Sequence, residues 1–387
     1  MMWDQLTDDE RAWKARCRAF AADVIAPRAA AHDRGNTFAA DVHDAAHAAG
    51  LMNVCIPAAL GGQGAGHRVL AVGGEELAAA CAPIAFSLGF NHGALRPIIA
   101  FGSEPQRRLV RELVADRGYA SICMTEAASS GSSLARIRSR AVRRGDGWVL
   151  TAAKQMIGNG TVARLYVVLA SAIVDGHDRG PTFFIVPRGP GVRVGENPEK
   201  IGFRALPTPP VDFEAVEVPD EQRIGAIGGA EAVLVDSLDF MRFGGGCVLL
   251  GLVTGALREV MPWLESRVVG DGETLVEKSH VQLLLGDLFG ELRALRALLW
   301  QTAEQLDAGR RCSIETAIVK LRASRLAERA TSEIAQLLGW RGIDAAYGAE
   351  KRMRDARVTT VYEGTTEVQR LNLFAELRRA LRAGGDL

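Results

Sequence analysis

A change of hydrophobic period, from helix to strand and back to helix, most constrains how this chain of 387 residues can fold. Apolar residues first recur at helical spacing, as at Trp13, Cys17 and Phe20. From Ser121 the period changes, and helical spacing returns after Gly228. Between these points lie three β-branched or alternating runs of strand length, at 165–170, 182–187 and 211–218. The sequence predicts an α+β multidomain protein with a β region between two helical regions.

The breaks in this pattern suggest three domains. We expect an N-terminal α-helical domain at 1–119, in which the sequence from Thr7 to Glu10 has the spacing of a capping box at the start of the first helix. A compact middle antiparallel β domain is expected at 120–228. A C-terminal α-helical domain, a four-helix bundle, is expected at 229–387.

The C-terminal region predicts three long helices. The first covers 233–267, the second 281–308, and the third runs from a Ser313 cap to Leu338. Glycines recur between 244 and 255, where close helix packing requires small residues. We also expect this glycine-rich stretch to provide a flat face for subunit association.

Composition excludes several classes of function. The 46 basic and 46 acidic residues leave no net field that would attract nucleic acid or an anionic membrane. The six cysteines are scattered, with no C-x-x-C pair, and are expected as core residues in a reducing compartment. His43 and His47 lack the glutamate of a metalloprotease motif, so packing or surface roles are favoured and no metal site is predicted. No secretory signal or 18-residue uncharged apolar run occurs, which predicts a soluble cytoplasmic protein.

Glu363 is the main candidate for a catalytic residue. It stands in RDARVTTVYEGTTEVQR (354–370), where Gly364 permits a sharp turn and Thr365 can start a new helix. A carboxylate held at such a break in apolar surroundings can act as a general base, because burial raises its pKa. The alternative is a loop glutamate beside a turn glycine.

The longer motif resembles the C-terminal signature of the acyl-CoA dehydrogenase family, and the resemblance covers nearly the whole chain in the same motif order. It implies that Glu363 removes the α-proton of an acyl thioester. It further implies that Thr365, Thr366 and Glu367 close over an FAD cofactor, and that Gly364 contacts the substrate.

Two further motifs, in the middle region, are similar to FAD-binding segments of that family. The resemblance implies that Thr125 touches the pyrimidine edge of the flavin and that the backbone of Gly131 and Ser132 approaches its pyrophosphate. Small residues there let several N–H groups converge on an anion. The loop differs from the family pattern at Ala127 and Ser133 and is one residue longer.

The second segment contains Met156, Ile157 and Gly158, at positions that face the flavin in the family. Gly158 replaces a Thr or Ser whose hydroxyl donates to flavin N5. Loss of such a donor at flavin N5 would typically weaken electron acceptance by about 1–3 kcal/mol if nothing replaces it. The segment from Lys200 to Arg204 resembles a K-x-G-x-R turn that precedes the last β-strands in the family. This resemblance implies a structural role and no catalytic one.

The C-terminal region supplies the remaining positions implied by the resemblance. Asp239 and Arg242, three residues apart on one helical face, match a pair beside the thioester; the alternative is a solvated ion pair. Arg267 matches an arginine that reaches FAD across a dimer interface, although the motif around it is altered. Gln336 belongs to a cofactor-binding loop in which Trp340 replaces a glycine.

These expectations combine into one function and two alternatives. The function is FAD-dependent α,β-dehydrogenation, in which Glu363 takes the α-proton and flavin N5 takes the β-hydride. A first alternative is another flavin reaction, such as oxygenation or ring formation on a tethered substrate, suggested by Met156 and Gly158. A second is a FAD-poor subunit that pairs with a complete homologue, suggested by the surroundings of Arg267 and Trp340.

The partners follow from the same resemblance. The thioester would be carried by CoA or by an acyl carrier protein, and the acyl group is left open. The electron acceptor would be an electron-transfer flavoprotein or oxygen. A homodimer or homotetramer is expected, without nucleic acid or membrane.

Overall fold

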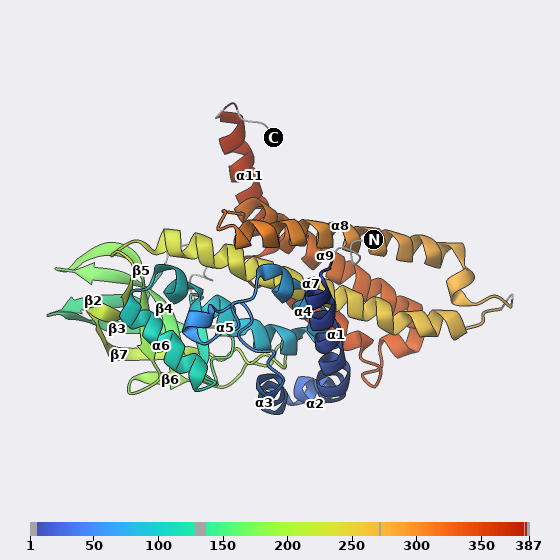
Figure 1. The fold of residues 1–387 in the computed structure, drawn as a ribbon, viewed down its shortest axis with the longest axis horizontal. Helices are drawn as coiled ribbons and strands as arrows, with labels where there is room; N and C mark the ends of the chain where they lie inside the picture. Colours follow the sequence, from blue (N-terminus) through green and yellow to red (C-terminus); the bar gives the residue numbers. More distant parts are fainter. Residues whose placement is uncertain (1–5, 128–136, 271, 383, 385–387) are drawn as a thin grey trace.

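A computed structural model describes residues 6–127, 137–270, 272–382 and 384 of the chain. Along the sequence, helical regions lie before and after a β-sheet region, as the change of period predicts, and the sheet lies at one end of the molecule (left in Figure 1). The capping box is present, with Thr7 Oγ1 accepting from Glu10 N–H and the Glu10 carboxylate accepting from Thr7 N–H. The N-terminal helices are α1 (Asp8–Phe20), α2 (Ala26–Gly35), α3 (Ala40–Ala48), α4 (His67–Ala80), α5 (Ala82–Phe101) and α6 (Glu104–Ala115), with a π-helical turn at Ala21–Ile25.

The middle region forms one sheet in the order β6-β7-β3-β2-β4-β5-β8, with β1 also paired to β4. Its strands are β1 (Tyr119–Cys123), β2 (Arg140–Arg144), β3 (Gly147–Lys154), β4 (Ala163–Val174), β5 (His177–Pro187), β6 (Val192–Val194), β7 (Val211–Pro219) and β8 (Arg223–Ile224). Short turns make β2–β3 and β4–β5 antiparallel, but β1 and β2 both run parallel to β4. The expectation of an antiparallel domain is therefore wrong for these two pairs. Apolar runs reveal strands, whereas only the connections between them reveal direction.

The C-terminal helices lie close to the predicted positions. They are α7 (Ala230–Ser266), α8 (Ser279–Asp307), α9 (Ser313–Leu338), α10 (Ala349–Thr359) and α11 (Thr366–Arg382). Gly339 ends α9 with a positive φ of 61°. The predicted Ser313 cap is wrong: the N-cap is Cys312, and the Ser313 hydroxyl instead donates to Asp239 at 2.6 Å.

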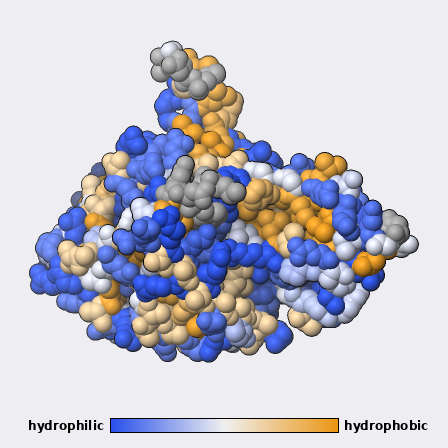
Figure 2. Space-filling view, turned by 45° about the vertical axis from the view of Figure 1, so that its right-hand side comes forward, coloured by the Kyte–Doolittle hydropathy of each residue, from blue (hydrophilic) through white to orange (hydrophobic). Residues whose placement is uncertain are grey.

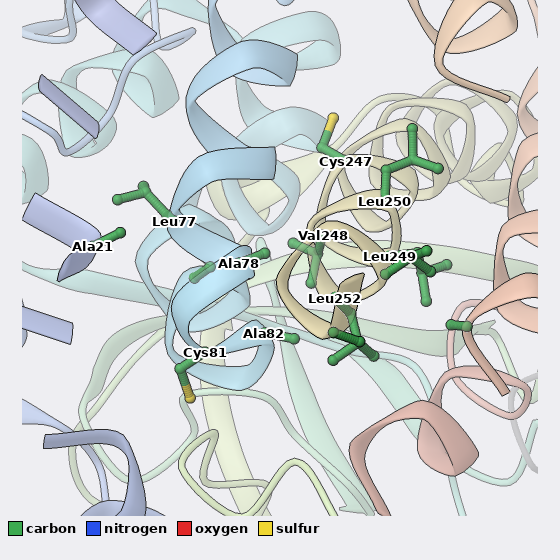
Figure 3. Packing of buried hydrophobic residues seen from close by; sticks show 14 of the residues in the cluster. Ala21, Leu77, Ala78, Cys81, Ala82, Cys247, Val248, Leu249, Leu250 and Leu252 are labelled. Carbon is green, nitrogen blue, oxygen red and sulfur yellow. The ribbon is translucent and has the colours of Figure 1, made fainter. Parts of the chain in front are cut away.

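Helix α7 lies at the centre of the helical part and packs against α4, α5 and α9 (Figures 1 and 3). A Cβ on Gly251 would meet the Ala78 side chain and the Glu75 carbonyl of α4, each at 2.5 Å. A Cβ on Gly246 would collide with Val319 of α9. The glycine-rich stretch therefore allows close packing within the chain, and the expectation that it forms a face between subunits is corrected.

The hydropathy of α7 reflects this central position. Helix α7 contains an 18-residue window with a mean hydropathy of 1.6, which by length and composition alone would suit a membrane span. However, 83% of that window is buried inside the protein. Burial against α4, α5 and α9 accounts for the apolar composition.

Helix α5 connects the helical part to the sheet. Its residues Leu95 and Ile98 belong to an apolar cluster shared with Val167 of β4 and Ile185 of β5. Leu88, on the preceding turns of the helix, belongs to the cluster formed with α4 and α7. One helix thus sets the distance between the sheet and α7, and the candidate site lies along it.

Helix α11 projects away from the body of the protein (Figure 1). It carries exposed apolar residues at helical spacing, and Figure 2 shows apolar surface along it. These residues are Leu371, Phe374, Leu377 and Leu381. Such a continuous exposed apolar stripe is typical of a surface that binds another protein.

Candidate active site

Glu363 lies in the break between α10 and α11, as the sequence predicts. Its φ is 55° and that of Gly364 is 87°. Positive φ is natural for glycine but costs about 1–3 kcal/mol for most other residues, and such conformations gather at functional sites. The surrounding contacts must hold Glu363 in this conformation.

Gln369 and Thr365 fix the break from the side of α11. The fully buried Gln369 amide donates to the carbonyl oxygens of Glu363 at 3.2 Å and of Gly364 at 3.1 Å. Thr365 Oγ1 accepts from Val368 N–H at 3.3 Å, in the manner of a helix cap. Thr366 is buried, and the exposed Glu367 accepts from Thr366 Oγ1 and pairs with Arg370.

Tyr362 anchors the other side of Glu363. Its ring lies 5.2 Å from that of Phe86 and 5.4 Å from that of Phe203, between ring centroids. Lys320 Nζ lies 5.1 Å from the Tyr362 ring centroid, a cation–π contact. Aromatic packing of Tyr362 and the hydrogen bonds donated by the Gln369 amide together restrain Glu363, which lies between them in the sequence.

The Glu363 carboxylate is directed at α7. A Cβ on Gly245 would collide with it, so only glycine at that position leaves room for the carboxylate. Its Oε2 is buried and has no hydrogen-bond partner among the described residues. Burial raises the pKa of Glu363, while the nearby cations Lys320 and Arg242 act in the opposite direction. Because its pKa is raised, the Glu363 carboxylate binds a proton more readily than an exposed glutamate does.

Lys320 is a fully buried cation whose charge acts on this carboxylate. Its ammonium donates to the Thr359 carbonyl at 2.5 Å, at the end of α10, and to Ser324 Oγ at 3.3 Å. Burial lowers the pKa of Lys320, and Glu363 counteracts this. Lys320 thus ties α9 to the helix that leads into the break.

Asp239 and Arg242 are both buried, which rules out the solvated ion pair considered as an alternative. The closest approach between them is 3.8 Å, and hydroxyls of Ser313 at 2.6 Å and Thr316 at 3.3 Å donate to Asp239. Burial raises the pKa of Asp239, and these hydroxyls and Arg242 oppose it. The Nε of Arg242 is buried without a partner among the described residues.

Two predicted cofactor segments of the middle region, at Thr125 and at 156–158, follow the ends of β1 and β3. Gln155 N–H donates to the Thr125 carbonyl at 2.9 Å, which joins the two motifs. Met156 has a φ of 58° and is half exposed, whereas Ile157 is buried. Gly131 and Ser132 lie outside the described residues.

Gly158 is buried against α5. Ser121 Oγ donates to its carbonyl at 2.7 Å. A Cβ at this position would collide with the Phe90 ring, so a Thr or Ser could not be accommodated without movement of Phe90. The glycine and the phenylalanine form a matched pair of small and large residues, which the sequence motif did not reveal.

Lys154 and Glu126 form a buried ion pair next to Thr125. Lys154 Nζ lies 2.8 Å from the Glu126 carboxylate, which also accepts from Ser139 Oγ at 2.5 Å and from Arg138 N–H at 2.8 Å. Burial opposes ionisation of Glu126, but these hydrogen bonds outweigh it and lower its pKa to about 2. The pair joins residues on both sides of the loop, a role that the sequence analysis missed.

Arg267, Gln336 and Trp340 lie elsewhere. Arg267 follows α7 and stacks on Trp263, whose indole donates to the Leu337 carbonyl at 3.2 Å. Gln336, near the end of α9, and Trp340, in the turn that follows α9, are both exposed. Trp263 is roughly 27 Å beyond Gly245 along α7, at a rise of about 1.5 Å per residue. A single chain therefore does not bring these three residues to Glu363.

An apolar cavity of about 80 Å³ lies between α4, α5 and α7, with Glu363 in its wall. Phe86, Phe90 and Phe240 contribute aromatic rings to the lining. No cluster of three or more potential metal ligands occurs among the described residues. The arrangement is that of an acid–base group in the wall of an apolar cavity.

Comparison with known families gives one consistent result over the three regions. Residues 7–116 match the acyl-CoA dehydrogenase N-terminal domain, 121–216 the middle domain, and 228–377 the C-terminal domain.

Individual relatives match over the full length. Cyclohex-1-ene-1-carbonyl-CoA dehydrogenase of Geobacter metallireducens is 33% identical over 369 residues, which cover 95% of this chain and 97% of the relative. The human mitochondrial short-chain specific acyl-CoA dehydrogenase is 31% identical over 370 residues, covering 95% of this chain and 89% of the relative. The structure of butyryl-CoA dehydrogenase from Megasphaera elsdenii superimposes with a TM-score of 0.91 at 27% identity, covering 96% of this chain and 99% of that one.

Proposed function

Because the chain belongs to the acyl-CoA dehydrogenase family of FAD-dependent oxidoreductases, we propose that it catalyses α,β-dehydrogenation of an acyl thioester. One observation supports this proposal most: an unpartnered, buried oxygen of Glu363 in the wall of an apolar cavity. A carboxylate whose pKa is raised by burial is suited to general base catalysis near neutral pH.

The residues around Glu363 provide the positioning that this reaction requires. The Glu363 carboxylate accepts the proton that leaves the α-carbon. Its backbone N–H donates a hydrogen bond to the thioester carbonyl oxygen, on which negative charge develops. Gly245, Tyr362 and Gln369 limit the movement of the carboxylate. Phe86 and Phe90 keep water away from the reacting carbons.

The residues present fit an FAD cofactor. Buried polar atoms without partners among the described residues occur in the break, at Tyr362 Oη and Glu363 Oε2, and at Gln369 Oε1 of α11, as expected of a site that a polar ligand completes. When bound, FAD supplies the acceptor for the hydride from the β-carbon, so that the substrate loses two electrons and forms one C=C bond. The residues proposed to hold it within one chain are Thr125, Gly131, Ser132, Met156, Ile157, Gly158, Thr365, Thr366 and Glu367.

Arg267, Gln336 and Trp340 are proposed to contact the FAD of a partner subunit. Their distance from Glu363 along α7 supports this division between two chains. The exposed apolar stripe on α11 supports a homodimer or homotetramer. Cytoplasmic location and an electron-transfer flavoprotein or oxygen as electron acceptor are part of the same proposal.

Asp239, Arg242 and Gly364 are proposed to bind the thioester arm of the substrate. Arg242 Nε is a buried donor without a partner among the described residues, and it lies on the same helix as Gly245. The arm belongs to CoA or to a carrier protein. Both present the same phosphopantetheine thioester.

The test of this proposal is the substitution Glu363→Gln. The amide keeps the size of the side chain but cannot accept the α-proton. We expect the rate of flavin reduction by a thioester substrate to fall by about 10²–10⁴-fold, measured anaerobically by stopped flow at matched FAD content. Glu217→Gln is the matched control, because Glu217 is exposed on β7 and has no proposed role in the site, so this variant should leave the rate within a few-fold of wild type.

Two results would redirect the assignment. An unchanged reduction rate in Glu363→Gln would remove Glu363 from the mechanism and favour another flavin reaction on the same fold. A purified wild-type protein that is colourless and fails to bind added FAD would favour the FAD-poor partner subunit.

A further inference from the structure

The cavity beside Glu363 is apolar and carries no counter-charge for a charged acyl group. Its walls come from α4, α5, β1, α7 and the break. The lining residues are Leu70, Gly74, Ala85, Phe86, Gly89, Phe90, His92, Gly93, Ala94, Ile122, Phe240, Met241, Gly244, Gly245, Cys247, Val248 and Glu363. None of them is a lysine or an arginine, so burial of a second carboxylate here would be strongly unfavourable.

His92 does not supply the missing positive charge. Its Nε2 accepts from Cys55 N–H at 3.1 Å, and its Nδ1 therefore donates to the Gly89 carbonyl at 2.9 Å. Burial lowers the pKa of His92 to about 4, with the Gly89 hydrogen bond acting against it, so the ring is neutral at physiological pH. The wall around the reacting carbons is therefore uncharged apart from Glu363.

The glycines that line this cavity differ in how much space a side chain would find there. At Gly245 and Gly93 the space of a side chain is already filled, by Glu363 and by Met241, whose Cγ lies 2.8 Å from where a Cβ on Gly93 would be. At Gly244 a Cβ would meet nothing within 4 Å, and at Gly89 the nearest atom would be 3.9 Å away. These two open positions lie in the wall of the same cavity as Glu363.

The cavity is also small. A volume of about 80 Å³ is far below the 300–1,000 Å³ of typical drug-sized pockets. The rings of Phe86, Phe90 and Phe240 form part of its wall. A long straight chain would need displacement of packed side chains, whereas a substituent beside the α-carbon would fill existing space.

We propose that this cavity selects a short, uncharged acyl group that is branched or alicyclic next to the thioester carbonyl. This inference rests on the dehydrogenation proposed above. It assigns Gly244 and Gly89 as specificity-determining positions, because they leave open the volume that the extra carbons occupy.

The first experiment compares five CoA thioesters as reductants of the flavin in the FAD-loaded protein under anaerobic conditions. They are butanoyl, octanoyl, 2-methylbutanoyl, cyclohexanecarbonyl and glutaryl thioesters. We expect kcat/KM for 2-methylbutanoyl-CoA or cyclohexanecarbonyl-CoA to exceed the values for octanoyl-CoA and glutaryl-CoA by at least about 10-fold, the scale of discrimination by one misplaced methylene.

The outcomes separate the two proposals. Preference for octanoyl-CoA or glutaryl-CoA would overturn the assigned acyl class and leave dehydrogenation intact. Absence of flavin reduction by all five thioesters would contradict the dehydrogenation itself, and the acyl class would fall with it.

The second experiment fills the open volume with Gly244→Val. We expect the ratio of kcat/KM for cyclohexanecarbonyl-CoA over butanoyl-CoA to fall by about 10-fold or more. Gly89→Ala is the second variant, in case valine disturbs α7, and Gly290→Ala is the control for a helical glycine with an open, exposed position on α8. An unchanged ratio in folded, FAD-loaded Gly244→Val and Gly89→Ala would overturn the proposal.

Discussion

The carboxylate of Glu363 occupies the space in which a side chain on residue 245 would lie. Gly245 belongs to the central helix α7, and Glu363 to the break between α10 and α11. The position of the base is therefore set by a contact between two segments that are far apart in the sequence.

Gly245→Ala should move the base without removing it. The methyl group would displace the carboxylate, and a shift of about 1 Å can cost about 10²-fold in rate. We expect a comparable loss in anaerobic flavin reduction, with thermal stability close to wild type because alanine favours the helix. Gly286→Ala on α8, where a Cβ meets nothing within 4 Å, is the control. Retention of the full rate in Gly245→Ala would show that the carboxylate is not held by this contact.

The rate of flavin reduction should rise with pH. Glu363 must be ionised to accept a proton, and burial raises its pKa, so activity is lost as pH falls through this raised value. Lys320 and Arg242 favour the ionised form, and Lys320→Met removes one of these charges. The midpoint of the pH profile should therefore move to higher pH in Lys320→Met and remain near the wild-type value in Lys320→Arg. A midpoint in Lys320→Met equal to that of wild type would refute this electrostatic role.

Glu126→Gln should destabilise the middle domain. It leaves the Lys154 ammonium buried without its charged partner, and breaking a buried pair typically costs about 3–5 kcal/mol. The folded-state pKa of Glu126 is lowered to about 2, so the stabilisation is present above the ordinary carboxylate pKa and is lost as pH falls through about 2. Urea unfolding should show a deficit that shrinks below about pH 5. The exposed Glu217 on β7 provides a control, and an equal deficit in Glu217→Gln would contradict the assignment.

Gly158 and Phe90 should be energetically coupled. Gly158→Thr forces a side chain into the Phe90 ring, and such overpacking typically costs about 1–3 kcal/mol. Phe90→Ala removes the obstacle, so the double variant should be more stable than the sum of the two single effects. A denaturant-based double-mutant cycle measures this coupling. Strict additivity would mean that the two positions relax independently.

Phe374→Asp should weaken subunit association. The substitution places a charge in the exposed apolar stripe of α11, where burial against a partner would be opposed. Light scattering at micromolar concentration should report a smaller mass than for wild type. Ala375→Asp adds the same charge at an exposed position beside the stripe and should alter the mass less. Identical masses for wild type and Phe374→Asp would remove α11 from the interface.

The sequence predicts well those features that depend on local pattern. Gly364 and the following threonines identify the break at Glu363, and helical spacing identifies α9 almost to the residue. The direction of β1 and β2 relative to β4 was missed, because alternation of apolar residues is the same in parallel and antiparallel strands.

The local sequence pattern does not predict contacts between segments that are far apart in the sequence. Gly245 resembles any glycine of a packed helix, and its contact with Glu363 depends on how α7 and the break are placed. One signal was available for Lys320: it stands at helical spacing with Ala323 and Ala327 on the buried face of α9, where a charge is unusual. A buried cation on an apolar helical face is a reason to search for an acidic partner.

The projection of α11 from the body has a thermodynamic consequence. Its first turn is joined to the Glu363 backbone through Gln369, so a second protein that captures the outer part of α11 also restrains the connection that carries the base. Free-energy coupling between two binding events is reciprocal. An acyl thioester that orders the connection would then strengthen subunit association by the same factor by which association strengthens thioester binding. Dilution of the protein would therefore weaken its apparent affinity for the substrate.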